Sequence, residues 1–264
     1  MKPLSALDAA ACTGLRGVLC DIDDTLTWEG KLVPAAFLAL EALRSAGLRV
    51  VPVTGRPGGW VDHLARMWPV DGVVGENGGL WFHLDAGGRM VRRFAQDPDV
   101  RRRNRERLDE LAGLILDRVP GAALASDQAY RDLDLAVDFC EDVAPLPRAA
   151  IDAIVEQFRA AGATSKVSSI HVNGWFGAFD KLAGCTAFVR ERWGEDLAAD
   201  RDRWLYVGDS PNDEPMFAFF PLSVGVANVA RFVDRMRHLP RFVTPSNGGH
   251  GFAELAEVVL THRR

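Results

Sequence analysis

The sequence predicts an α/β fold, with a doubly wound, mostly parallel sheet and a smaller α/β domain inserted into it. Three short apolar runs, 18–20, 50–53 and 204–207, each end in turn-forming residues and predict buried central strands. Segments with helical periodicity separate these runs, as in doubly wound sheets. Because ligands bind at the carboxyl ends of the strands in such sheets, we expect a site where the three runs end.

Helix and turn signals place the other elements of this core. Pro34 begins a helical pattern that Gly47 closes, and a glycine-rich turn at 75–79 leads into a hairpin. The elements expected on these grounds are helices at 34–46 and 57–67, a strand at 72–74, a hairpin of 80–84 with 90–94, a helix at 182–193, strands at 222–226 and 242–244, and a final helix at 251–260.

The pattern changes between about residues 97 and 173. A charged helix, two strands, a second helix and a last strand-like run are expected at 100–119, 122–125, 133–139, 146–161 and 164–172. We therefore expect a catalytic core made of 1–96 and 174–264, interrupted by an inserted α/β domain at 97–173.

Composition describes an ordinary globular protein of 264 residues, 48% hydrophobic and 25% charged. Its net charge of −5 argues against a nucleic-acid binder, although arginines cluster near residue 100. Interleaved acidic residues favour a solvated helix face there over a surface that attracts anionic substrates. The four cysteines have no paired spacing, no run could span a membrane, and the N-terminus does not resemble a secretion signal. We expect a cytoplasmic monomer or homodimer.

The first run ends in two carboxylates one residue apart, Asp21 and Asp23. Burying this much negative charge calls for a reason, although Asp23 alone could be a turn residue or a helix cap. A carboxylate such as Asp21 can attack phosphorus and form an aspartyl-phosphate, which divides one hard displacement into two easier ones. Asp23 lies on the same face of the strand, where it can protonate the leaving oxygen and then take a proton from water.

The second run ends in a hydroxyl and free backbone N–H groups, at Thr54, Gly55 and Arg56. A phosphoryl group needs mainly positioning and neutralisation of its charge. The Thr54 hydroxyl and the Gly55 N–H can hold phosphate oxygens, with Arg56 beside them, and Lys181 in the first turn of a later helix supplies a positive charge. A turn at Thr54 and a solvated Lys181 are the ordinary alternatives.

The third run ends in two more carboxylates, Asp209 and Asp213, with Asn212 between them. This segment could also be a simple turn with Pro211 at the first helical position. Two carboxylates 4 Å apart repel by roughly 4 kcal/mol at an effective dielectric constant near 20, so one lysine cannot balance this set around a phosphate. A divalent cation would, and all-oxygen ligands with several waters favour Mg²⁺.

Taken in order, Asp21 with Asp23, then Thr54, Lys181 and the segment from Asp209 to Asp213, the chain resembles the haloacid dehalogenase superfamily in all four motifs. The resemblance covers nearly the whole chain. It implies that the Mg²⁺ ligands are the Asp21 carboxylate, the Asp23 backbone carbonyl and the Asp209 carboxylate, with Asp213 close behind. The insertion resembles the type-two cap of subclass B, found in many sugar-phosphate phosphatases and in phosphomannomutases.

The insertion is expected to choose the substrate. Alternate residues near its last strand could face the cleft, or this strand could be a solvated edge. The candidates there are Lys166, Ser168, Ser169, His171 and Asn173. Asn77 in the glycine-rich turn is a further candidate, because a similar segment lies near the site in related phosphatases. Its alternative explanation is a turn that requires a positive φ.

The function expected from these residues is a Mg²⁺-dependent phosphatase that acts on a small phosphate ester, with a sugar phosphate as the leading candidate. A phosphomutase with the same motifs is one alternative. A phospho-accepting switch of the receiver type is another, because receivers also combine Asp, Thr, Lys and Mg²⁺. In receivers, however, the acidic pair and the phosphorylated aspartate come from different strands, whereas one strand end supplies both Asp21 and Asp23 here.

Overall fold

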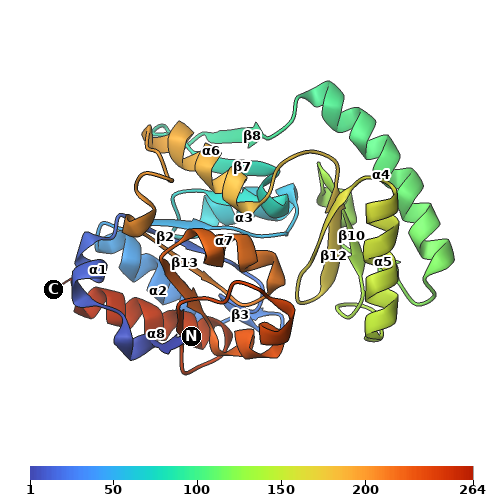
Figure 1. The fold of residues 1–264 in the computed structure, drawn as a ribbon. Coiled ribbons are helices and arrows are strands. Elements are labelled where there is room, and N and C mark those ends of the chain that lie inside the picture. Colours follow the sequence, from blue (N-terminus) through green and yellow to red (C-terminus); the bar gives the residue numbers. More distant parts are fainter. Residues whose placement is uncertain (264) are drawn as a thin grey trace.

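The structure is a computed structural model that describes residues 1–263, and a six-stranded parallel sheet is its largest sheet (Figure 1). The strand order is β1-β15-β14-β13-β2-β5, so the three predicted central strands lie side by side. The strands are β1 Lys2–Pro3, β2 Gly17–Cys20, β5 Arg49–Pro52, β13 Trp204–Gly208, β14 Leu222–Gly225 and β15 Phe242–Val243. The expected doubly wound parallel sheet is confirmed, and β1 is an edge strand that the sequence did not predict. Arg264, the last residue of the expected core, lies outside the described residues.

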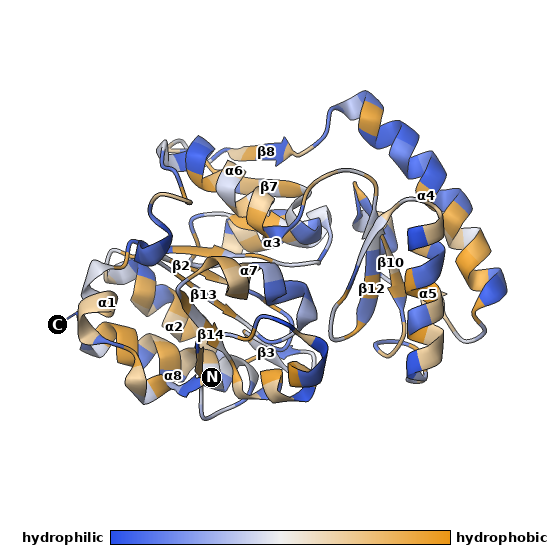
Figure 2. Ribbon diagram, in the orientation of Figure 1, coloured by the Kyte–Doolittle hydropathy of each residue, from blue (hydrophilic) through white to orange (hydrophobic). Residues whose placement is uncertain are grey.

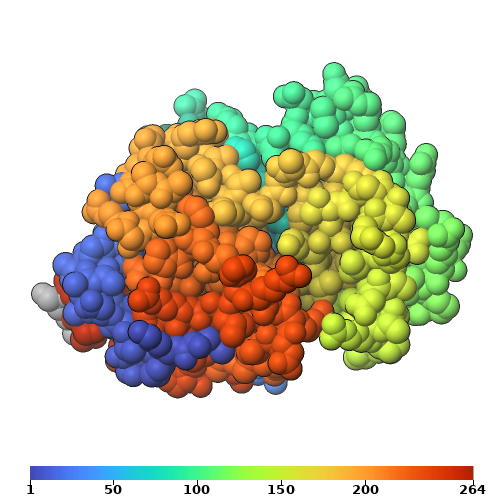
Figure 3. All heavy atoms as spheres, viewed as in Figure 1, coloured from blue at the N-terminus to red at the C-terminus, as the bar shows by residue number. Residues whose placement is uncertain are grey.

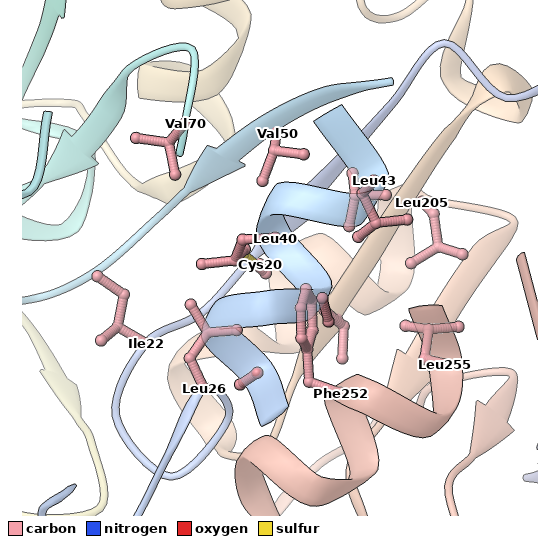
Figure 4. Close-up of a cluster of buried hydrophobic side chains, with 14 of the residues drawn as sticks. Cys20, Ile22, Leu26, Leu40, Leu43, Val50, Val70, Leu205, Phe252 and Leu255 are labelled. Carbon is pink, nitrogen blue, oxygen red and sulfur yellow. The ribbon is translucent and has the colours of Figure 1, made fainter. Parts of the chain in front are cut away.

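Helices cover both faces of this sheet. Successive residues of β2 point to opposite faces, so its apolar side chains are buried on both sides. Cys20 packs with Leu40 and Phe252, from two of these helices, on one side, as Figure 4 shows. Leu19 packs with Phe188, from a third helix, on the other side. The helices of the core are α1 Ala9–Gly14, α2 Pro34–Ser45, α3 Gly58–Met67, α6 Lys181–Trp193, α7 Glu214–Phe219 and α8 Gly248–Thr261. With both faces covered, the polar residues of the predicted site are left at the strand ends.

Two small antiparallel sheets and several short 3₁₀ segments complete the core. The hairpin expected at 80–84 and 90–94 is present with these bounds. The strands are β3 Thr27–Trp28 with β4 Lys31–Leu32, and β6 Val73–Gly75 with β7 Leu80–Leu84 and β8 Met90–Phe94. The 3₁₀ segments, one of them in the insertion, are η1 Leu4–Ala6, η2 Glu76–Gly78, η3 Gln128–Tyr130, η4 Arg201–Arg203, η5 Pro211–Asp213 and η6 Ala227–Arg235.

The insertion forms a second layer beside the core, and we call the segment from α4 to β12 the cap. Its antiparallel sheet has the order β11-β12-β10-β9. Two helices with alternating hydrophilic and hydrophobic residues cover the face of this sheet that lies away from the core (Figures 1 and 2). The elements are α4 Pro98–Arg118, β9 Ala123–Leu124, β10 Asp134–Asp138, α5 Arg148–Ala160, β11 Thr164–Val167 and β12 His171–Trp175. The opposite face is therefore turned towards the core.

The expectation of one strand-like run at 164–172 was wrong, because this segment is a hairpin. Ser168 interrupts it: its hydroxyl accepts hydrogen bonds from the N–H groups of Ile170 and His171, and its own N–H donates to the His171 carbonyl. Serine favours such local side-chain bonds over a continuous strand. The second strand of the hairpin continues to Trp175, past the predicted domain limit at 173, and the division of the chain into domains stays a prediction.

Candidate active site

Three neighbouring strand ends bring the predicted residues together. Asp21 follows β2, Thr54 lies two residues beyond β5, and Asp209 follows β13. Because these strands are parallel neighbours, they end at the same edge of the sheet. Asp21, Thr54 and Asp209 are all less than 5% exposed.

Lys181 completes this group from the first position of α6. Its Nζ donates to Oδ1 of Asp21 and to Oδ1 of Asp213, at 2.6 Å each. Burial opposes the charge of this lysine, but the two carboxylates outweigh burial and raise the pKa of Lys181. The lysine is therefore a fixed positive charge in the closed core and not a solvated surface group.

The glycine-rich turn of η2 holds the helix that carries Lys181. Gly78 has a φ of 96°, and a Cβ at this position would overlap the backbone of Asp180, which caps α6. Asn77 has a φ of 54°, so the expected need for a positive φ is present. Its amide also lies beside Gly55, with an Nδ2 that has no hydrogen-bond partner among residues 1–263. Both explanations of Asn77 therefore have a structural basis.

Burial disfavours the ionised forms of Asp21 and Asp209, and for Asp21 the charge of Lys181 offsets this only in part. Burial raises the pKa of Asp21 to about 8 against the opposing charge of Lys181. Burial and the nearby Asp21 also raise the pKa of Asp209. Asn228 donates to Oδ2 of Asp209 at 3.0 Å, while Oδ1 has no hydrogen-bond partner within the described chain. A buried, unpartnered carboxylate oxygen beside two other carboxylates is what a cation ligand requires.

The carboxylates of Asp21, Asp209 and Asp213 fit a metal in chemistry and in position. Each offers an oxygen, and these oxygens lie within 4.8 Å of one another. Hard divalent cations such as Mg²⁺ prefer this donor set. The site is therefore consistent with a metal, and Mg²⁺ itself is an inference from the ligand type.

Asp213 differs from the other two carboxylates because both of its oxygens already have partners. Oδ1 accepts from Lys181 and from the Tyr206 hydroxyl. Oδ2 accepts from the backbone N–H groups of Asp209 and Ser210. We infer that Asp213 mainly positions Lys181 and this loop, and its predicted role as a metal ligand stays a prediction.

Thr54 and Arg56 form a tight turn at the end of β5. The Thr54 hydroxyl accepts from the Arg56 N–H at 3.0 Å, so its proton remains free to be donated. The Arg56 guanidinium contacts Asp23, with Nε 3.0 Å from Oδ1. Its Nη2 donates to Glu141 of the cap at 2.7 Å, and its Nη1 lies 3.4 Å from Asp127, also of the cap. Arg56 therefore links the predicted acid to the insertion.

Residues of the cap hairpin lie directly over Asp21. They enclose a cavity of about 10 Å³, together with residues of the core. The lining residues are Asp21, Asp23, Gly55, Arg56, Ser168, Ser169, Ile170, His171, Asn173, Ser210 and Asn212. A space of this size holds about one water molecule. The structure thus brings Ser169, His171 and Asn173 to the predicted catalytic residues, in a closed arrangement that Figure 3 also shows as continuous contact between core and cap.

Four of the predicted cap contacts are already engaged or lie outside this cavity. The Asn173 amide donates to Asp134 at 2.8 Å, and Nε2 of His171 lies 2.9 Å from Glu141. Ser168 forms the hairpin turn described above. Lys166, on β11, does not line the cavity.

Sequence reasoning missed a buried network that joins the core to the cap. The Glu76 carboxylate accepts from four backbone N–H groups, one in the core and three at residues 132–134 of the cap. Arg131 donates to the Gly55 carbonyl and to Asp134. No local pattern could have revealed these contacts. Asn228 was also missed, but it follows the strand expected at 222–226, and the same strand-end rule could have found it.

The comparisons with known proteins agree with this geometry. No protein-family model matches the chain. A phosphoglycolate phosphatase from Methanospirillum hungatei JF-1 is 27% identical over 252 residues, which are 94% of this chain and 98% of that protein. Solved structures that are less than 20% identical to this chain share its fold.

A haloacid dehalogenase-like hydrolase from Bacteroides thetaiotaomicron has a TM-score of 0.63 at 15% identity, with 93% of this chain and 99% of that chain covered. The sucrose-phosphatase from Synechocystis sp. PCC6803, solved with sucrose and phosphate, also has a TM-score of 0.63, at 17% identity, with 93% and 98% covered.

The strand-end site lies in a fold shared with that haloacid dehalogenase-like hydrolase, in which an insertion interrupts the core with the parallel sheet. The relative from Methanospirillum hungatei and the neighbour from Synechocystis are both phosphatases by name, and each is similar to more than nine-tenths of this chain. Among residues 1–263, no helix is both long and apolar enough to cross a membrane.

Proposed function

We propose that this chain is a Mg²⁺-dependent phosphatase that hydrolyses a small phosphorylated metabolite, with a sugar phosphate as the leading candidate. The observation that carries the proposal is Lys181, buried between Asp21 and Asp213, beside the unpartnered oxygen of Asp209. This arrangement provides a carboxylate that can attack phosphorus and a lysine that can neutralise charge on the phosphoryl group. The sucrose-phosphatase neighbour supports the choice of a sugar phosphate by its fold.

Asp21 would act as the nucleophile. Its Oδ1 is held by Lys181, while Oδ2 makes no hydrogen bond to the described chain and belongs to a side chain that lines the cavity. Attack by this oxygen on phosphorus forms an aspartyl-phosphate and releases the leaving alcohol. The Thr54 hydroxyl, the Gly55 N–H and the amides of Asn77 and Asn212 would hold the phosphoryl oxygens.

Asp23 would protonate the leaving oxygen and then accept a proton from the water that hydrolyses the intermediate. Arg56 fixes the position of its carboxylate. Asp21, Asp209 and the Asp23 carbonyl would hold Mg²⁺, with Asp213 behind them, and the ion would neutralise charge on the phosphoryl group. The cap must open to admit the substrate, because the cavity over Asp21 is too small for a phosphate ester.

The test is a phosphate-release assay over sugar phosphates, phosphoglycolate and phosphoglycerates, with product analysis. Free phosphate and a dephosphorylated alcohol support the phosphatase. An isomeric phosphate ester would instead identify a phosphomutase, and a stable phosphoprotein without turnover would identify a receiver-type switch. Release of phosphate that persists in Asp21→Asn would contradict the proposed nucleophile.

A further inference from the structure

A second cavity of about 250 Å³ lies next to the one over Asp21. The two cavities share Asp23, Arg56, Ser169 and Ile170. The second is lined by Asp23, Asp24, Thr27, Glu29, Gly30, Arg56, Cys140, Glu141, Ser169 and Ile170. Because Asp23 is the proposed acid, the group that it protonates must lie on this side of the phosphorus. The second cavity is therefore placed to receive the leaving group.

The charges on the wall of this cavity are mainly negative. Four carboxylates, Asp23, Asp24, Glu29 and Glu141, line it together with a single guanidinium, that of Arg56. This leaves a formal excess of three negative charges. Burial raises the pKa of Asp24, and the charge of Arg231 opposes this rise. Arg231 itself lies over the Trp28 ring, 5.2 Å from its centroid, and does not line the cavity.

The Arg56 guanidinium is not available to an anionic ligand in this arrangement. It is 6% exposed and pairs with Asp23, Glu141 and Asp127 at 2.9, 2.7 and 3.4 Å. His171 is likewise turned to Glu141, at 2.9 Å. Glu141 therefore contacts both Arg56 and His171, the two basic side chains that line the cavity over Asp21.

The position of Glu141 is built into the cap. It follows β10, and the Asp138 carboxylate accepts from the backbone N–H groups of Cys140, Glu141 and Asp142 at 2.8 to 2.9 Å. Burial opposes the charge of Glu141, but the adjacent His171 and Arg56 side chains lower its pKa to about 2. Glu141 is therefore negatively charged at neutral pH in this closed arrangement.

We propose that this cavity receives the leaving group and selects against carboxylates, with Glu141 as the residue that sets the selection. The substrate is then a phosphate ester of an uncharged or positively charged alcohol. A carboxylate there would meet like charges and find Arg56 already paired. This inference rests on the proposed phosphatase function. It separates the chain from its relative, which is named for phosphoglycolate, an ester whose leaving alcohol, glycolate, carries a carboxylate.

The test uses three phosphate esters with two-carbon leaving groups that differ in charge: 2-hydroxyethyl phosphate, phosphoethanolamine and phosphoglycolate. We expect kcat/KM of the wild-type protein to be at least about tenfold higher for the first two than for phosphoglycolate. Glu141→Gln keeps the size of the side chain, removes one negative charge and loosens its hold on Arg56. We expect this variant to lower the ratio of kcat/KM for the first two esters to kcat/KM for phosphoglycolate by about threefold or more. The main cause should be a higher kcat/KM for phosphoglycolate.

Glu156→Gln is the matched control, because Glu156 is a cap residue on α5 that pairs with Arg159 and whose side chain is 52% exposed. It should keep the wild-type ratio, and melting curves of both variants check folding. Equal or better use of phosphoglycolate by the wild type would overturn the charge selection, and an unchanged ratio in Glu141→Gln would overturn the role of Glu141. Hydrolysis of p-nitrophenyl phosphate with Mg²⁺ is measured alongside. If this ester releases phosphate while the charge ratios fail, only the inference falls; if no ester releases phosphate, the proposed function falls with it.

Discussion

The two aspartates that follow β2 have different surroundings, and these surroundings predict different roles. Asp21 is 4% exposed and touches the ammonium group of Lys181, whereas Asp23 is partly exposed and touches the Arg56 guanidinium. A carboxylate fixed by an ammonium group keeps one oxygen for attack. A carboxylate at the cavity wall can exchange a proton with the leaving group and with water.

We therefore expect Asp21→Asn to lower kcat by at least about a thousandfold without loss of the folded state, because an amide cannot attack phosphorus.

Asp23→Asn should lose only proton transfer. With an aryl phosphate, whose leaving group needs little protonation, it should accumulate a phosphoenzyme. Rapid acid quench and peptide mapping would locate the phosphate, and its presence on any residue other than Asp21 would rule out this assignment.

A substitution of Asn228 tests the metal site, because Asn228 donates a hydrogen bond to Asp209 and is not itself a predicted ligand. Its amide donates to Asp209 and to the Asp24 carbonyl, and its oxygen accepts from the Gly248 N–H. Loss of a group that orients a metal ligand typically weakens metal binding by about 10 to 100-fold. Asn228→Ala should raise the Mg²⁺ concentration for half-maximal activity by a factor in this range. An unchanged Mg²⁺ requirement would contradict the role of Asn228 in positioning Asp209.

Local sequence patterns predicted the positions of helices and strands well where interactions between neighbouring residues determine them. The hairpin at 80–94 was found with the observed bounds from the glycine-rich turn before it. The three strand ends of the site were found because apolar residues change abruptly to polar residues there. The turn at Ser168 was missed because two serines, Ser168 and Ser169, are a weak signal inside a run of strand-forming residues. Glu141 and Arg131 were missed because their partners in the core are 85 and 76 residues away in the sequence.

The contact between the cap and the strand end of β5 should respond to acid. The pKa of Glu141 is lowered from 4.5 to about 2 in the folded protein. A carboxylate with a lowered pKa stabilises the folded state fully above pH 4.5, and this contribution is lost as the pH falls from 4.5 towards 2. The melting temperature of the wild type should therefore fall more between pH 6 and pH 3 than that of Glu141→Gln. Parallel curves for the two proteins, with Glu156→Gln as the surface control, would contradict this coupling.

For the whole molecule, activity should depend strictly on a divalent cation. Chelation should abolish phosphate release and added Mg²⁺ should restore it, because one lysine cannot balance the buried carboxylates around a phosphate. Ca²⁺ should bind without supporting turnover, since its looser coordination can engage both oxygens of Asp21 and leave no aimed nucleophile. Calorimetry provides a readout independent of turnover: both ions should raise the melting temperature. Full activity in excess chelator would exclude the proposed mechanism.

The order in which the site residues occur along the chain has a consequence for synthesis. Strand β2 is central, but one of its two neighbours, β13, begins at Trp204, and Lys181 is 160 residues away from Asp21. A ribosome that has made the first half of the protein has therefore produced an apolar strand with one open edge and no complete catalyst. Such late pairing slows folding and exposes the edge to other chains. The nascent protein is thus exposed to aggregation, and dependent on chaperones, until β13 has been translated.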